Sequence, residues 1–200
     1  MQPGVEFGNH NVIDYVPEKA RALSGSLAKL PGLIFEAHST DYQTRDALRA
    51  LVSDGFVILK VGPGLTFALR EALYGLDLIA EFLFPARRSE TLVATMERVM
   101  TSEARNWEKY YHGSAQQQYL QRHFSYSDRI RYYCPHPEVA AATDMLFSAL
   151  EEVIIPETMI CQYLQGLYPQ VRSGKVKADA KALAIAAVGR VLEDYFEACR

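Results

Sequence analysis

The fold expected for this chain follows from one stretch, FVILKVGPGLTFALREALYGLDLIAEFL, at residues 56–83. A short apolar, β-branched run at 56–61 meets a Gly-Pro-Gly turn at 62–64, and apolar residues then recur every three or four positions. The recurring residues share one helix face: Leu69, Leu73, Leu76, Ala80 and Leu83. The stretch therefore predicts a strand that leads into an amphipathic helix, with Thr66 as the helix N-cap.

The turn also suggests a binding role. Gly62 and Gly64 precede a helix N-terminus, where free backbone N–H groups and the positive end of the helix dipole attract anions. With the hydroxyl of Thr66 beside them, these glycines are candidate phosphate-binding residues.

Composition excludes several classes of protein. The 200 residues are 49% apolar and 22% charged, as expected of a globular domain with a substantial core. The formal net charge of −3 disfavours binding to nucleic acid or to an anionic membrane. No apolar run approaches the roughly 20 residues of a membrane span, and no signal region is evident, so a cytoplasmic location is expected. The three widely spaced cysteines are typical of reduced thiols.

Strands and helices alternate upstream of the opening stretch. Two strands and two helices are expected there: strands at 4–7 and 33–38, and helices at 17–29, with Pro17 in the first turn, and at 44–52, capped by Thr44. Downstream, only helices are expected: 89–111, one after Pro137, one after Pro156, and 179–198. The chain is thus predicted to be α/β, with three parallel βα units over residues 1–84 and a helical region over 85–200 that packs on them.

Such an arrangement is incomplete as a fold. Three parallel strands cannot close a barrel, and their sheet has two edges with unpaired N–H and C=O groups. The sequence therefore predicts the C-terminal part of a larger fold, completed by another polypeptide or lost by truncation.

Each predicted strand carries an ionisable residue near its C-terminal end, namely Glu6, Glu36 and Lys60. In a (β/α)8 barrel this end holds the active site, which makes the three residues candidate catalytic groups. Alternatively, Glu36 and Lys60 form a buried ion pair between neighbouring strands. Sequence position alone leaves both interpretations open.

Three further residues are candidates for the site. His38 follows the second strand and is a candidate catalytic group or metal ligand, although a lone histidine more often has a structural role. Arg129 and Arg131 lie in an aromatic stretch and are candidate phosphate ligands. We favour the alternative for these arginines, which is a contact surface rich in Tyr, Trp and Arg.

Three segments carry a family resemblance: FEAHSTDYQT at 35–44, LKVGPGLTFALREAL at 59–73 and SDRIRYY at 127–133. They resemble the Z-subunit (GatZ/KbaZ) family of class II D-tagatose-1,6-bisphosphate aldolase, and the likeness covers nearly the whole chain but only about the C-terminal half of a family member. The resemblance implies a TIM barrel with Glu6, Glu36 and Lys60 on its last three strands. Cys134 stands where the family usually has Trp, and Gly64 replaces the usual Ala.

The resemblance implies a role in carbohydrate catabolism. Family members are described as the non-catalytic partner that supports the catalytic aldolase subunit, so this subunit, or self-association, is the expected partner. Some relatives are instead D-tagatose 6-phosphate 4-epimerases, which act on a sugar phosphate. In that alternative His38 is a metal ligand or acid/base group, Glu36 or Glu6 is a base, and Lys60 is an electrostatic stabiliser.

The remaining expectations concern a metal, a truncated fragment and a kinase activity. A divalent metal such as zinc is expected only in the intact protein, and a third alternative is a truncated fragment without independent activity. A kinase is not supported, because the sequence has no P-loop or other nucleotide signature.

Overall fold

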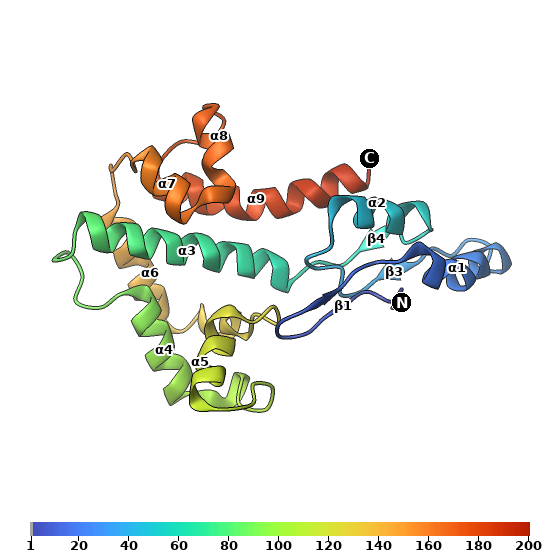
Figure 1. Ribbon diagram of the computed structural model, residues 1–200, viewed down its shortest axis with the longest axis horizontal. Helices are drawn as coiled ribbons and strands as arrows, with labels where there is room; N and C mark the ends of the chain where they lie inside the picture. The colour runs from blue at the N-terminus through green and yellow to red at the C-terminus, as the bar shows by residue number, and fades with distance from the viewer. Residues whose placement is uncertain (1) are drawn as a thin grey trace.

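The structure, a computed structural model, describes residues 2–200 and is mostly helical. A larger helical part adjoins a smaller part that holds the strands and the end of the last helix (Figure 1). The smaller part contains β1 (Glu6–Phe7), β2 (Val12–Ile13), α1 (Pro17–Ser26), η1 (Leu27–Lys29), β3 (Glu36–Ala37), α2 (Arg45–Ser53) and β4 (Ile58–Leu59). The larger part contains α3 (Pro63–Leu83), α4 (Leu92–Ser102), η2 (Ala104–Asn106), α5 (Ala115–Phe124), η3 (Arg129–Tyr133), α6 (Pro137–Ala149), α7 (Glu157–Tyr163), η4 (Gln165–Leu167), α8 (Tyr168–Arg172) and α9 (Ala180–Ala198).

Two of the three predicted strands pair as expected. β3 and β4 are parallel neighbours, with Glu36 opposite Ile58 and Ala37 opposite Leu59. Each is only two residues long, shorter than the six-residue runs that predicted them. The parallel pairing brings the C-terminal ends of both strands to one edge of the sheet.

The pairing of the first strand differs from the predicted parallel arrangement. β1 pairs antiparallel with β2 through a turn in which the Gly8 N–H donates to the Asn11 carbonyl oxygen (2.9 Å). The segment between the two strands is too short for a parallel crossover, which needs a dozen residues or more. Glu6 therefore lies on a hairpin and not on a third parallel strand. Within residues 2–200 the strands form two separate two-stranded sheets and no closed barrel.

The sequence locates several helix starts. Pro17 lies in the first turn of α1, and the Thr44 side chain caps α2 by accepting from the Ala47 N–H (3.2 Å). The cap predicted for α3 is wrong, since the helix begins at Pro63 with Gly62 as its N-cap. Pro63 is suited to this place because its missing N–H would have no partner in the helix.

The region after α3 has shorter helices than predicted. The helix expected over 89–111 ends at Ser102, and the chain then folds back so that the Trp107 indole N–H donates to the Met100 carbonyl oxygen (2.6 Å). α5 was not predicted, although Ser114 and Gln117 form a capping box at its start.

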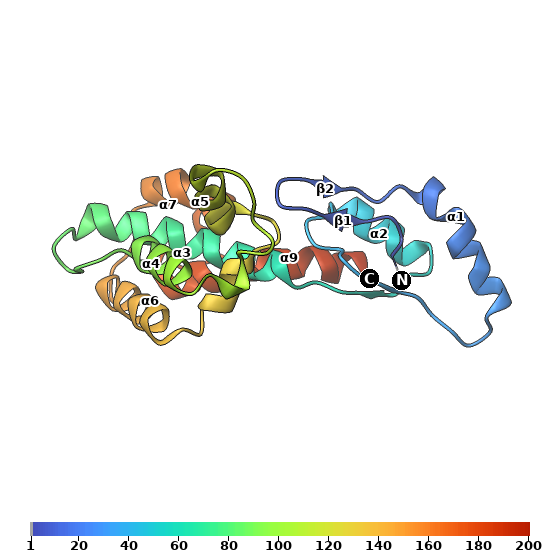
Figure 2. The same ribbon diagram turned by 90° about the horizontal axis from the view of Figure 1, so that it is seen from below.

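Among residues 2–200, the buried apolar side chains form two hydrophobic cores. The larger core has 23 buried residues and is formed by α3, α4, α6, α7 and α9 with the segments between them. The smaller core has nine buried residues from the N-terminal 56 residues and Ala198. α9 runs alongside α3 and ends against α2, so it contributes to both cores (Figure 2). The division predicted at residue 84 stays a prediction.

α3 is the central helix of the larger core. It approaches α7 so closely that a Cβ at Gly75 would lie 2.7 Å from the Leu164 side chain and 2.8 Å from the Tyr163 carbonyl oxygen. No helix among residues 2–200 combines the length and apolar character needed to cross a membrane.

Candidate functional site

Glu36, His38 and Lys60 meet at the C-terminal ends of the parallel strands, and we call them the Glu36 cluster. Glu36 Oε1 lies 2.8 Å from His38 Nε2 and 3.2 Å from Lys60 Nζ. Strand alternation puts Glu36 and His38 on one face, and the pairing of β3 with β4 brings Lys60 beside them. Of the four predicted catalytic residues, Glu36 therefore contacts two others, His38 and Lys60.

The cluster is accessible, unlike the buried ion pair considered for Glu36 and Lys60. The side chains of Glu36, His38 and Lys60 are 38%, 47% and 54% exposed. Hydrogen bonds from Lys60 and then from His38 lower the pKa of the Glu36 carboxyl below its ordinary value. An ionised Glu36 has no proton to give, so His38 Nε2 is the donor, and Nδ1 is the acceptor of the neutral ring.

The loop that follows β3 has an unusual backbone. Ser39 and Tyr42 adopt positive φ values of 58° and 66°, which non-glycine residues rarely do. Thr40, between them, is fully buried and donates its hydroxyl to the Lys60 carbonyl oxygen (2.7 Å). This hydrogen bond holds the loop against the end of β4, and backbone strain of the kind seen at Ser39 and Tyr42 concentrates at functional sites.

Asp41 occupies the predicted phosphate seat, a position that was not predicted for it from the sequence. Its Oδ1 accepts hydrogen bonds from the N–H groups of Gly62 and Gly64, both at 2.8 Å. The carboxylate thereby accepts hydrogen bonds from the free N–H groups at the start of α3, as a bound anion would. A phosphate at this turn would have to take the place of Asp41, and the binding role of the two glycines stays a prediction.

The remaining predicted phosphate ligands are also engaged elsewhere. Thr66 donates its hydroxyl to the buried Asp128, and Arg129 donates to the Asn106 carbonyl oxygen while it stacks on Tyr110. Arg131 donates Nη1 to the carbonyl oxygen of Asp128 (2.8 Å). These contacts hold η3 in place, and phosphate binding by the three residues stays a prediction.

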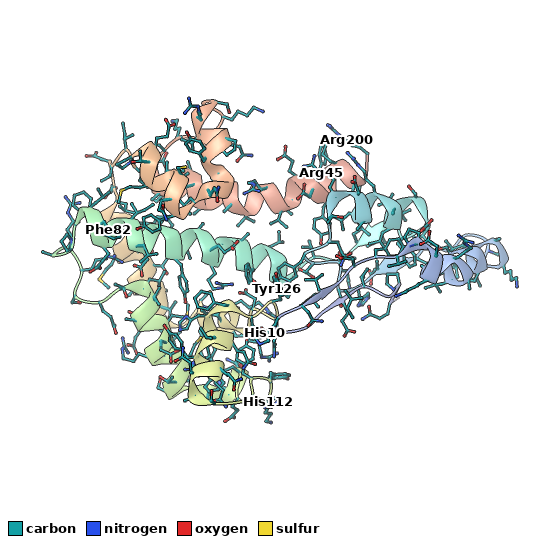
Figure 3. All side chains as sticks on the ribbon, in the orientation of Figure 1. His10, Arg45, Phe82, His112, Tyr126 and Arg200 are labelled. Carbon is teal, nitrogen blue, oxygen red and sulfur yellow. The ribbon has the colours of Figure 1, made fainter. Side chains whose placement is uncertain are left out.

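Glu6 and Tyr126 show how the hairpin joins this region. Glu6 is exposed on β1, outside the sheet of the Glu36 cluster, and its catalytic role stays a prediction. Tyr126, labelled in Figure 3, donates its N–H to the Asn9 carbonyl oxygen (3.1 Å) and packs its ring 4.6 Å from that of Tyr42. The hairpin, the strained loop and the segment before η3 are thus tied together.

The Glu36 cluster does not fit a zinc site by itself. Structural and catalytic zinc ions take three or four protein ligands, whereas His38 and Glu36 supply two, and the Lys60 ammonium already lies on the same carboxylate oxygen. Across residues 2–200, no three His, Cys, Asp or Glu side chains gather as a metal site would require. The three cysteines are free thiols.

Comparison with known proteins identifies the family. The sequence matches the family described as "D-tagatose-1,6-bisphosphate aldolase subunit GatZ/KbaZ-like" over residues 1–200, and the chain belongs to it. It is 51% identical over 198 residues to a protein of Agrobacterium fabrum named D-tagatose 6-phosphate 4-epimerase, covering 99% of this chain and 46% of the relative.

A solved structure is also similar to the chain over nearly its whole length. A crystal structure from Sinorhizobium meliloti 1021, titled a probable tagatose 6 phosphate kinase, superposes with a TM-score of 0.98 at 67% identity. The match covers 99% of this chain and 51% of the crystallised one. The chain spans about half the length of these relatives.

Proposed function

We propose, from this family membership, that the chain carries the acid/base groups of a ketohexose-phosphate 4-epimerase. The observation that supports the proposal is the Glu36 cluster, in which one carboxylate contacts both an imidazole and an ammonium group at an accessible sheet edge. The 51% identical relative named a D-tagatose 6-phosphate 4-epimerase suggests the substrate. Because the chain spans about half of that relative, the activity is proposed for the whole protein.

Epimerisation at C4 needs no external oxidant if the C3–C4 bond breaks and re-forms. A base removes the C4 hydroxyl proton, C4 becomes an aldehyde carbon, and the electrons of the C3–C4 bond form an enediolate with the neighbouring C2 carbonyl. The aldehyde turns over and C3 attacks its opposite face. The proton returns to O4, so atoms and electrons balance, and D-tagatose 6-phosphate becomes D-fructose 6-phosphate.

Each member of the Glu36 cluster has a role in this step. His38 Nδ1 takes and returns the O4 proton, while Glu36 accepts from Nε2 and stabilises the imidazolium that forms. Lys60 supplies positive charge beside the enediolate oxygen. Glu6 stays a second candidate base. No step is assigned to a metal, because a zinc site here would need ligands from outside the described residues.

The phosphate end of the substrate is proposed to bind at the turn formed by Gly62, Gly64 and Thr66, or at Arg129 and Arg131. The N–H groups of Gly62 and Gly64 are already bonded to Asp41, so a ligand at the turn must displace that carboxylate. We place the reaction in the cytoplasm, where sugar phosphates occur.

A turnover assay with a matched pair of variants tests the proposal. The protein that carries this chain is mixed with D-tagatose 6-phosphate, and D-fructose 6-phosphate is measured by NMR. We expect His38→Ala to lower kcat by about 10²–10⁴-fold, as is typical of a lost acid/base group. His10→Ala, which alters an exposed histidine of the hairpin turn, should keep full activity. No conversion by the unaltered protein, or an unaffected His38→Ala, contradicts the proposal.

A second candidate function is support of a catalytic aldolase subunit, to which the family description refers. The observation that favours it is an exposed aromatic surface: Tyr110 and Tyr132 are 50% and 47% exposed, and Arg129 stacks between them. Tyr and Arg are enriched at protein interfaces. Co-purification with a class II tagatose-bisphosphate aldolase chain, lost in Tyr132→Ala, is the result expected of this function. Failure to bind counts against it and leaves self-association as the other proposed use of the surface.

We also propose that β3 and β4 belong to a (β/α)8 barrel in the whole protein. The support is that both outer edges of their two-stranded sheet lack a strand partner within residues 2–200, and that the relatives are about twice as long. A structure of the whole protein with any other β arrangement around β3 and β4 would contradict this.

A further inference from the structure

The outer face of α9 is apolar, although the described residues leave it uncovered. α9 packs against α3 and α2 on its other side (Figure 1), where its buried residues lie. A helix at the surface of a protein normally carries polar residues on its outer face. In α9 that face carries Ile185, Leu192 and Phe196, which are 73%, 47% and 58% exposed. With Ala182 and Gly189 they recur every three or four positions, and we call these five residues the α9 stripe.

Gly189 lies at the centre of the α9 stripe, and no contact inside the described chain requires a glycine there. A Cβ at Gly189 would meet no atom of the described residues within 4 Å, and its φ is not positive. A glycine in the interior of a helix is destabilising relative to alanine. A second helix that crosses at this point would make use of the glycine, because the missing side chain lets two backbones approach closely.

The α9 stripe is complementary in size to a second copy of itself. When two copies of α9 pack antiparallel about a two-fold axis at Gly189, residues equally far before and after Gly189 face each other across the pair. Ala182 and Phe196 are each seven positions from Gly189, so the small side chain of one copy faces the large one of the other. Ile185 of one copy lies within one position of Leu192 of the other.

The charges at the ends of the α9 stripe also match in this arrangement. Asp179 accepts from the Ala182 N–H at 2.8 Å, and Arg200 lies 4.3 Å above the centre of the Phe196 ring. Because Phe196 of one copy faces Ala182 of the other, Arg200 of the first copy comes close to Asp179 of the second. This pairing of opposite charges forms twice, once at each end of the helix pair.

Charge also distinguishes the antiparallel pair from a parallel one. Lys181 and Glu197 are each eight positions from Gly189, so an antiparallel pair brings them to the same level with opposite charges. A parallel pair would instead bring Lys181 beside Lys181 and Glu197 beside Glu197, and like charges repel. The second copy therefore fits the α9 stripe in the antiparallel direction.

We propose that α9 is a homodimer interface, in which the α9 stripes of two copies pack antiparallel and cross at Gly189. This surface is separate from the aromatic surface of Tyr110 and Tyr132 and does not depend on the proposed epimerase activity. A helix face of 19 residues is about 28 Å long and about 10 Å wide. It is smaller than the roughly 800 Å² per partner of a standard interface, so we expect a dissociation constant on the order of micromolar.

Analytical ultracentrifugation of the whole protein that carries this chain tests the proposal. We expect a monomer–dimer equilibrium between about 1 and 100 μM protein, and a dissociation constant that Ile185→Glu raises by about tenfold or more. Ile154→Glu is the matched control, because Ile154 is an isoleucine that is 83% exposed and lies outside α9. A monomer throughout this range, or a dimer that Ile185→Glu weakens no more than Ile154→Glu does, overturns the proposal.

A cross-linking experiment tests the crossing point and does not depend on the folding of Ile185→Glu. The open space around Gly189 can hold a side chain, so Gly189→Cys should fold. Its two thiols face each other across the two-fold axis, and mild oxidation should join the copies through a disulfide. The unaltered protein, in which Cys134, Cys161 and Cys199 are free thiols, gives the background.

Phe196→Cys is the control for the direction of the pair. Its two thiols would be about 21 Å apart in the antiparallel pair, but side by side in a parallel one. Non-reducing electrophoresis should therefore show a covalent dimer above background for Gly189→Cys and none for Phe196→Cys. No cross-link in Gly189→Cys, or equal cross-linking in the two variants, overturns the proposal.

Discussion

The two cores of the molecule hold their residues in different ways. In the larger core, helices of up to 21 residues and the segments between them bury 23 of the described side chains, so its order comes mainly from local helix formation and dense packing. The smaller core buries nine side chains, its strands have two residues each, and hydrogen bonds between distant residues join its parts. Examples are the Tyr15 N–H to Gln43 (2.8 Å) and the Tyr195 hydroxyl to the Thr40 carbonyl oxygen (2.8 Å).

The Glu36 cluster lies with the smaller core, where a residue's place depends on long-range contacts. Binding regions are commonly drawn from the less stable parts of a fold, because they must adjust to a ligand. We therefore expect the larger core to supply most of the stability and the smaller core to carry the proposed acid/base groups.

A matched pair of leucine truncations gives the largest expected effect. Leu76 in α3 and Leu51 in α2 are both fully buried, one in each core. We expect Leu76→Ala to lower the free energy of unfolding by about 3–5 kcal/mol and Leu51→Ala by about 2–3 kcal/mol, because the smaller core can collapse around the cavity more easily. Denaturant unfolding measures both. A cost for Leu51→Ala equal to that of Leu76→Ala would remove the distinction between the cores.

The next largest loss of stability is expected when the hydroxyl of Tyr195 is removed, because this hydroxyl joins α9 to the strained loop. Tyr195→Phe removes the donor to the buried Thr40 carbonyl oxygen and should cost about 1–2 kcal/mol. Tyr132→Phe is the control, because Tyr132 is half exposed and its loss should stay within about 0.5 kcal/mol. Denaturant unfolding measures both variants. Equal losses of unfolding free energy would mean that the Tyr195 hydrogen bond does not hold the loop.

Helix caps provide a smaller comparison between the regions. Thr44 caps α2 and Thr91 caps α4, each by accepting from an N–H at 3.2 Å. Replacing either by Ala should cost about 1 kcal/mol, and Thr→Ser should retain most of it. In hydrogen exchange, Thr44→Ala should speed exchange in the smaller core only. Faster exchange throughout α3 and α4 would show instead that the two regions unfold together.

The smallest expected effect is the pH dependence due to His123 in the larger core. Burial lowers the pKa of His123, and Glu97 opposes this in part. Below about pH 6.5, His123 binds a proton more readily in the unfolded chain than in the folded chain. Its contribution to stability is therefore complete above that pH and is lost as the pH falls further.

His123→Gln tests the contribution directly. Thermal unfolding between pH 7 and pH 5 should show a weaker loss of stability in the variant than in the unaltered chain. An identical pH dependence in the two would show that His123 takes up a proton in the folded state.

Local patterns predicted much of this fold. The periodic leucines of α3, Pro17 at the start of α1 and the Thr44 cap each mark a feature set by residues within a few positions, and all appear in the structure. The parallel neighbours β3 and β4 followed from the alternation of strands and helices. The strand β1 is present, but its predicted parallel pairing was wrong, because its partner Val12–Ile13 is too short to leave a periodic signal.

The candidate site was predicted less completely, for a physical reason. Strand alternation put Glu36, His38 and Lys60 at related positions, and these residues do meet. Asp41 escaped notice because it caps a helix that begins more than 20 residues later, and no local pattern marks such a cap. The ion pair of Arg70 with Asp128 joins residues 58 positions apart, and no local sequence pattern predicts it either.

Hydrogen exchange of the whole protein that carries this chain, followed by mass spectrometry with and without D-tagatose 6-phosphate, tests the central proposal most directly. We expect slow exchange in α3, α4 and α6 and faster exchange around β3 and β4. The sugar phosphate should protect β3, β4 and residues 38–42, together with the proposed phosphate site at 62–66 or at 129–131. Uniform exchange across the two cores, or no protection of the Glu36 cluster by the sugar phosphate, would contradict the proposal.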